Sequence, residues 1–205
     1  MLTIGENIPS TAKQDRARAR AVVVVNRLAE RIKSTFEPIK SDWQNHRTEI
    51  ETLSHLGDAL ASQLYFASGS YENRDPGNKQ PTPPQRMRFL KELLPAIQDL
   101  SKMSLTHIAY HLFETLIGLL DFDPETVIVE ASQIVKAAEQ DAIGLEGLAV
   151  DKVVAFANRI IANYRDMLAS SERCQNALLD LLDVFVKHGW SEETLLTYRL
   201  HEIYR

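Results

Sequence analysis

Three side chains able to bind a metal ion follow one another on a single predicted helix. His107, His111 and Glu114 are separated by four and three residues, so at 100° per residue they fall within about 60° of one another on the helix surface. Imidazoles one turn apart can reach one ion, which makes a metal-dependent enzyme one interpretation of this chain. The zinc-protease motif, however, needs a Glu directly after the first His, and Ile108 stands there instead. Because the apolar face lies on the other side of this helix, an exposed trio is the competing interpretation, and we expect neither metal nor cofactor.

Motifs of the common nucleotide-binding and hydrolase sites are absent from the sequence. There is no Gly-Lys-Ser/Thr, no Gly-x-Gly-x-x-Gly and no Gly-x-Ser-x-Gly. Cys174 is the single cysteine, which excludes an internal disulfide and predicts a small buried side chain rather than an activated nucleophile. We therefore expect a protein that is not an enzyme.

A second candidate site is a basic stripe on a helix predicted from about residue 10 to 36. Its members fall within about 60° of one another and extend for roughly 27 Å; they are Lys13, Arg16, Arg20, Arg27 and Arg31. Such a stripe can follow a nucleic-acid backbone or an acidic protein surface. A solvated face is the simpler interpretation, since no aromatic residues interleave the stripe and the chain carries a net charge of −5. Nucleic-acid binding is therefore kept as an alternative.

Apolar periodicity predicts that residues 1–68 form a long antiparallel helical hairpin. The buried face of its first helix is predicted to contain Ala17, Ala21, Val25, Leu28 and Ile32. Pro38 ends that helix, and a second one is predicted from about residue 38 to 67. Gly57 either allows close contact with a neighbouring helix or weakens the middle of this one. The apolar residues of this helix follow a seven-residue pattern and include Trp43, Ile50, Leu53, Leu60 and Leu64. The polar, proline-containing segment 69–83 is then the linker to a domain of residues 84–205.

The strongest local signal is a break between two helices at residues 121–125. The Asp123 carboxylate can cap the second helix, and Pro124 suits the first helical position because its missing N–H would have no partner there. A break this short makes the two helices antiparallel neighbours. The same pattern returns 68 residues later, where Ser191 stands for Asp123 and a large aromatic again precedes the cap. A repeated helix-turn-helix unit is typical of a stacked array of helical hairpins. The alternative is that these are two unrelated amphipathic hairpins, which would share the same features.

The other segments also have helical periodicity. Pro95 is expected to kink or divide one helix, and Ser104 is expected to cap the next. The helices predicted after the linker cover about 84–100, 105–120, 123–140, 148–168, 171–188 and 192–204. The fold class is therefore all-α, with eight or nine helices and no strand.

The final predicted helix has an apolar face that is predicted to bind a partner. The residues of this face are Leu196, Leu200, Ile203 and Tyr204. A free-standing helical array usually ends on a helix with a polar outer face, so we expect this face either to pack fully inward or to meet another protein or a second copy. No signal peptide or membrane span is recognisable, which predicts a cytoplasmic chain without a membrane partner. Residues 1–104 carry a net charge of +3 and the rest −8, an asymmetry that indicates either different partners for the two ends or only a solubilising surface.

Residues 147–205 contain the segments GLAVDKVVAFANRIIANYRDML, CQNALLDLLDVFVKHGW and LTYRLHEIYR. They resemble the C-terminal helical part of large multidomain bacterial nucleotide-dependent proteins of defence or signalling, in which helical arrays sense partners. The resemblance implies a HEAT-like array, which would follow the N-terminal hairpin predicted from periodicity, in a bacterial setting that includes antiviral defence. This chain lacks the nucleotide site of such proteins, so no ATP-linked activity is implied. The expected function is a non-catalytic scaffold or adaptor that binds another protein.

Overall fold

The computed structural model describes residues 12–69, 83–139 and 150–187. Its helices are α1 (Ala12–Phe36), the 3-10 helix η1 (Lys40–Asp42), α2 (Arg47–Ser68), α3 (Pro83–Ser101), α4 (Thr106–Ile117), α5 (Pro124–Glu139), α6 (Val150–Asn163), α7 (Arg165–Ser170) and α8 (Glu172–Lys187). No strand occurs within these ranges, so the prediction of an all-α chain is confirmed for them. None of these helices is long and apolar enough to cross a bilayer.

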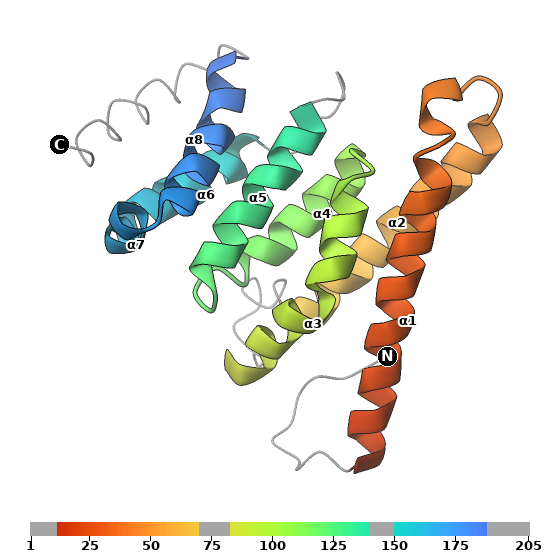
Figure 1. The fold of residues 1–205 in the computed structure, drawn as a ribbon, viewed down its shortest axis with the longest axis horizontal. Coiled ribbons are helices and arrows are strands. Elements are labelled where there is room, and N and C mark those ends of the chain that lie inside the picture. Colours follow the sequence, from red (N-terminus) through yellow and green to blue (C-terminus); the bar gives the residue numbers. More distant parts are fainter. Residues whose placement is uncertain (1–11, 70–82, 140–149, 188–205) are drawn as a thin grey trace.

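The helices lie in a row that follows the chain, with α1 and α2 at one end and α6 to α8 at the other (Figure 1). Within the row, α1 packs mainly along α3, α2 along α4, and α5 along α8. Helices α1 and α2 also contact each other, but each makes its larger contact with a later helix. The position of α1 is therefore set mostly by α3.

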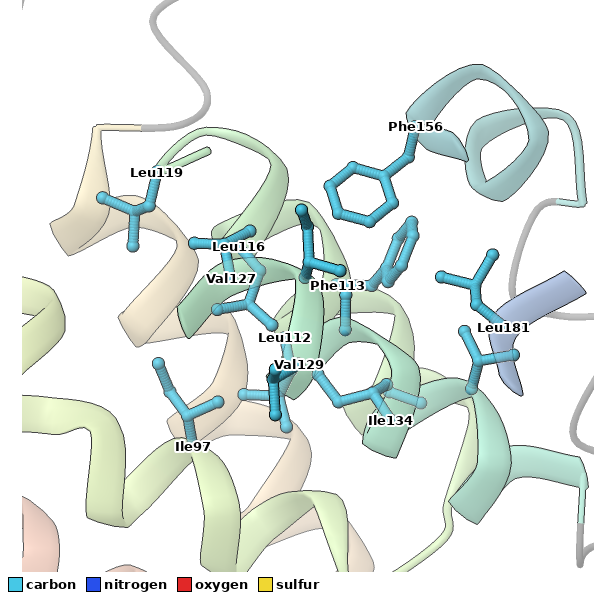
Figure 2. Close-up of a cluster of buried hydrophobic side chains, with 14 of the residues drawn as sticks. Ile97, Leu112, Phe113, Leu116, Leu119, Val127, Val129, Ile134, Phe156 and Leu181 are labelled. Atoms are coloured by element: carbon cyan, nitrogen blue, oxygen red, sulfur yellow. The ribbon is translucent and has the colours of Figure 1, made fainter. Parts of the chain in front are cut away.

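The centre of the hydrophobic core lies between α4 and α5 (Figure 2). Leu112, Phe113 and Leu116 of α4 are buried at three- and four-residue spacing, which places them on one face of the helix. The Phe113 ring meets Phe156 of α6 edge to face, with 5.3 Å between the ring centroids. Ile97 of α3 borders the same cluster. One continuous apolar core thus includes residues from α1 through α8.

The break between α4 and α5 follows the prediction closely. The Asp123 carboxylate accepts a hydrogen bond from the Thr126 N–H at 3.2 Å, and Pro124 is the first residue of α5. Phe122 is half-buried against the core, as expected for a hydrophobic residue that precedes the cap. The guanidinium of Arg86, in α3, lies 5.3 Å from the centre of the Phe122 ring. The predicted break and cap between these two helices are therefore confirmed. The corresponding break of the second predicted unit, from residue 188 on, lies outside the described residues.

Gly57 of α2 packs directly against Ile108 of α4 and against Met103, which precedes that helix. A Cβ atom added at Gly57 would lie 2.6 Å from Ile108 Cδ1 and 3.3 Å from Met103 Sδ. A Cβ atom in a folded protein essentially never comes within 3.0 Å of another heavy atom. The predicted role of Gly57 in close helix contact is confirmed, and its partner is α4.

The second helix starts later than predicted. Residues 37–46 form turns and η1, and Trp43 is 56% exposed instead of lying on the predicted apolar face of the second helix. The Asn45 amide donates to both carboxylate oxygens of Asp42, at 2.9 and 3.0 Å. Asp and Asn stabilise turns through such local hydrogen bonds, which compete with helix formation.

Two further predictions of helix ends are wrong. Leu105, rather than Ser104, is the residue before α4, and Ser104 has φ 57°, a left-handed conformation that replaces capping geometry. The helix predicted over 148–168 is divided at Tyr164 into α6 and α7. A tertiary hydrogen bond from the Tyr164 hydroxyl to Asp121 holds this residue at the end of α6. Pro95 was predicted to kink or divide its helix. Helix α3 continues through Pro95 without a break, and it changes direction along its length (Figure 1).

Candidate functional site

Helix α1 is attached to the rest of the molecule along one face. Ala29, Ile32 and Phe36 are buried, and their three- and four-residue spacing defines a single helical face. Val22 and Val25 are half-buried and pack against the same core. This face contacts α3 and α2. The exposed side chains of α1 therefore lie on the remaining part of its circumference.

Asn26 connects α1 to the proline-containing turn of α3. Its side-chain oxygen accepts a hydrogen bond from the Ala96 N–H at 3.1 Å, and its side-chain nitrogen donates to the Glu92 carbonyl at 3.0 Å. In a regular α-helix these two backbone groups would bond to each other. Pro95, next to Ala96, disturbs that turn because its ring crowds the preceding carbonyls. The Asn26 amide thus provides a partner for both groups.

Two ion pairs add to this attachment. Lys33 Nζ lies 2.7 Å from Asp99 Oδ1, and Arg18 Nε lies 3.5 Å from Glu92 Oε2. The hydrogen bond to Asp99 raises the pKa of Lys33. Because these contacts and Asn26 fix the rotation of α1, they also determine which of its residues face outward.

The basic stripe lies on the outer face of α1. Arg16, Arg20, Arg27 and Arg31 are all exposed, and at 100° per residue they lie opposite Ala29. None of the four forms an ion pair with another residue in the described part of the chain. The fifth predicted member, Lys13, has a side chain outside the described residues. The structure therefore brings four of the five predicted cations together on one exposed face of α1.

An apolar seam lies between the basic stripe and the packed face. We use this name for four residues spaced by four, three and four positions: Ala17, Ala21, Val24 and Leu28. Ala17 is exposed and Ala21 half-buried, while Val24 and Leu28 are 62% and 42% exposed. The prediction that Ala17 and Leu28 are buried is therefore wrong. The helix is rotated so that Ala29 and Phe36 point inward in their place.

Sequence reasoning missed the seam because α1 carries apolar residues on more than one face. Periodicity alone cannot decide between faces that both have helical spacing. The overlooked signal is Phe36, a large aromatic residue seven positions after Ala29. Large aromatic side chains dominate core energetics, so the face that carries Phe36 is the one that α3 and α2 cover.

The structure does not bring the three predicted metal ligands to one site. Glu114 Oε1 accepts a hydrogen bond from Lys152 Nζ at 2.8 Å, which links α4 to α6. His111 Nε2 lies 3.8 Å from Asp58 Oδ1 on α2, and His107 is exposed. Burial alone would lower the pKa of Lys152, but its hydrogen bonds to Glu114 and Tyr110, together with the attraction of these two groups for the ammonium, outweigh burial and raise the pKa. Over the described ranges, no group of three or more His, Cys, Asp or Glu is placed to hold a metal ion.

A polar cluster joins the end of α6 to the α4–α5 turn. Asp121 accepts hydrogen bonds from the Tyr164 hydroxyl and the Arg159 guanidinium, both at 2.5 Å. The bond from Tyr164 lowers the pKa of Asp121, while burial and the nearby carboxylate raise the pKa of Tyr164 to about 12. A tyrosine that retains its proton so strongly donates hydrogen bonds rather than acting as a base. The cluster therefore serves to hold two elements together.

An open groove of about 550 Å³ runs between α5 and α8. The ion pair between Lys136 and Asp180, with 2.5 Å between the charged atoms, links the two helices beside it. The lining mixes apolar Val129 and Ala177 with charged groups of both signs. Neither apolar residues nor charges of one sign predominate in this lining. The groove therefore indicates the chemistry of a ligand less clearly than the exposed face of α1 does.

Comparison with protein-family models, with curated proteins and with solved structures gives no significant match to this chain. The predicted C-terminal binding face, which comprises Leu196, Leu200, Ile203 and Tyr204, lies outside the described residues. Cys174 is buried in α8, as its sequence context predicts. Among the described residues, the outer face of α1 is therefore the candidate binding surface.

Proposed function

We propose that this chain is a non-catalytic helical scaffold that binds another protein through the outer face of α1. The observation that supports this proposal best is the exposure of Val24 and Leu28, one turn apart on the apolar seam. Adjacent exposed apolar side chains on a firmly attached helix are typical of interaction surfaces. Completing the burial of these two side chains in a complex would contribute about 1–2 kcal/mol each.

The wider setting of the proposal comes from the resemblance of residues 147–205. We propose that the paired helices form a HEAT-like array and that the partner belongs to a bacterial defence or signalling complex. The genes next to the coding region test this setting. An adjacent nuclease, NTPase or toxin supports it, whereas neighbours without any such function in several genomes contradict it.

Site-specific photo-cross-linking tests the binding function itself. A photoreactive amino acid replaces Val24, at the centre of the seam, in the full chain expressed in the source organism. Val186, on α8, is the matched control because it is 54% exposed and also aliphatic. We expect a discrete protein adduct from position 24 and none from position 186. Equal adducts from both positions, or none from position 24, would contradict a docking surface on α1.

Nucleic-acid binding by the basic stripe is the second candidate function. It is favoured by the four exposed arginines, which have no ion-pair partners among the described residues. Binding through phosphate contacts would weaken steeply with salt. Replacing Arg16 and Arg20 by Glu should then lower the affinity and reduce the logarithmic salt slope by about 2, since each lost phosphate contact removes about 0.9. An unchanged affinity and slope would exclude the stripe as the binding surface.

A further inference from the structure

We propose that the partner of α1 is an amphipathic helix that carries acidic residues along one edge of its apolar face. This inference rests on the proposed protein-binding function and specifies the chemistry of the partner. Its basis is the position of the apolar seam beside three exposed arginines: Arg20, Arg27 and Arg31.

The spacing of the seam is that of a helix-pairing surface. Its residues, separated by four, three and four positions, repeat as the inward-facing positions of a coiled coil do. From Ala17 to Leu28 the seam extends for about 17 Å at 1.5 Å per residue. Small residues at one end and larger ones at the other let a partner helix approach closely near Ala17 and bury its own side chains around Leu28. A partner helix of about three turns would cover the seam.

The arginines determine which helix fits. Arg20 and Arg27 each precede a seam residue and are seven positions apart, so they occupy the same flanking position in successive repeats. Opposite charges at flanking positions select partner and orientation in helix pairs. The matching partner therefore has Glu or Asp residues seven positions apart along the edge that faces these arginines.

A second copy of this chain does not meet that requirement. In an antiparallel pair of α1 helices, the flank that contains Arg20 and Arg27 would face the same flank of the other copy. Like charges at these positions oppose pairing. The other edge of the seam, which includes Val25, packs into the core of its own chain and is not free to receive the partner's arginines. The charge pattern thus favours a different, acidic chain.

Accessibility supports the proposal. The N-terminal part of α1 extends beyond the other described helices (Figure 1). Val24 and Leu28 are exposed although α3 and α2 both contact α1. A helix can therefore reach the seam without displacing the contacts of Asn26, which lies on another face of α1.

The test uses the full chain and two synthetic helical peptides of the same length. Both carry Leu and Ala at the inward-facing positions of three heptads; one has Glu at every flanking position and the other has Lys. A hydrocarbon cross-link on the outer face keeps the peptides helical in isolation, because most helical stability comes from tertiary packing that a free peptide lacks. Fluorescence anisotropy of labelled peptide, at low and at high salt, gives the dissociation constants.

We expect the Glu peptide to bind at least about tenfold more tightly than the Lys peptide, with the difference shrinking at high salt. Reversing both flanking charges, with Arg20→Glu and Arg27→Glu, should invert the preference. Val24→Asp should weaken binding of both peptides by about tenfold or more, since it places a charge at the centre of the contact. Val186→Asp should change neither. Circular dichroism and urea unfolding confirm that each variant is folded.

Several outcomes would overturn the inference. Binding of neither peptide, or equal binding of both, rejects an acidic helical partner; a discrete adduct from position 24 in the cross-linking experiment would then leave the protein-binding function standing. Dimerisation of the chain that Val24→Asp abolishes shows that a second copy occupies the seam. Binding to anionic vesicles or to DNA that the same arginine reversals abolish, without binding of the Glu peptide, assigns α1 to a membrane or a nucleic acid instead.

Discussion

The hydrogen bonds of Asn26 provide the most direct test of how α1 is held. Asn26→Ala removes the partners of two backbone groups at once, the Ala96 N–H and the Glu92 carbonyl. Ala96 is fully buried, so water cannot readily replace the lost acceptor. Orphaning a buried polar group costs about 1–3 kcal/mol. Because Asn26 itself is only half-buried, we take the lower part of the summed range and expect a loss of about 2–4 kcal/mol in the free energy of unfolding.

Replacing Pro95 by alanine distinguishes two causes of this loss: the missing hydrogen bonds of Asn26 and the missing packing of its side chain. With alanine at position 95 the turn of α3 can become regular, and the Ala96 N–H can return to the Glu92 carbonyl. In that background Asn26→Ala should cost less, with a coupling of about 1–2 kcal/mol between the two substitutions. Asn176→Ala, on the exposed surface of α8, is the control and should change stability by less than about 0.5 kcal/mol.

Urea unfolding of the four proteins, followed by circular dichroism, gives each free energy and therefore the coupling. If Asn26→Ala costs the same with and without Pro95, the amide does not act by replacing the disturbed helix hydrogen bond. If it costs less than about 0.5 kcal/mol in the wild-type background, within the range of ordinary surface substitutions, the proposed anchoring of α1 is wrong.

Three further predictions concern other parts of the core. Gly57→Ala should destabilise the chain by up to about 2 kcal/mol, because overpacking outweighs the roughly 1 kcal/mol gain in helix propensity. In a chain that also carries Ile108→Val, which removes the nearest atom, Gly57→Ala should be neutral or stabilising. Equal effects of Gly57→Ala in both backgrounds, measured by urea unfolding, would contradict the close contact. Asp123→Ala should cost about 1 kcal/mol and Asp123→Asn much less, since only the alanine variant loses the cap; equal losses in urea unfolding would argue against capping. Burial raises the pKa of Glu130 in the folded chain, although a hydrogen bond from Gln98 opposes this shift. The folded state therefore favours the protonated carboxyl group. The resulting stabilisation is fully present below about pH 4.5 and is lost as the pH rises through the raised pKa. Glu130→Gln should therefore unfold at higher urea concentration than the wild type at pH 7, with the difference shrinking toward pH 4, and a difference independent of pH would refute the raised pKa.

Features that depend on a few neighbouring residues could be predicted without the structure. The cap by Asp123, the start of α5 at Pro124 and the helical class of the chain depend on backbone geometry and local hydrogen bonds. The outward position of the basic stripe could also be derived, because charged side chains at helical spacing rarely share the buried face. The turns at residues 37–46 could also have been predicted from the sequence, because Asp42 and Asn45 are turn-forming residues.

Features that depend on contacts between residues far apart in the sequence could not be predicted without the structure. Whether Leu28 or Ala29 is buried depends on how Asn26 and Lys33 fix α1 against α3, some 66 to 70 residues away along the chain. The end of α6 depends in the same way on the bond between Tyr164 and Asp121. Sequence periodicity specifies that a helix has an apolar face, but its rotation is set by the packing partner. The amino-acid sequence thus determined the helices and their polar and apolar residues, whereas only tertiary contacts decided that Val24, Leu28 and the arginines form one exposed surface.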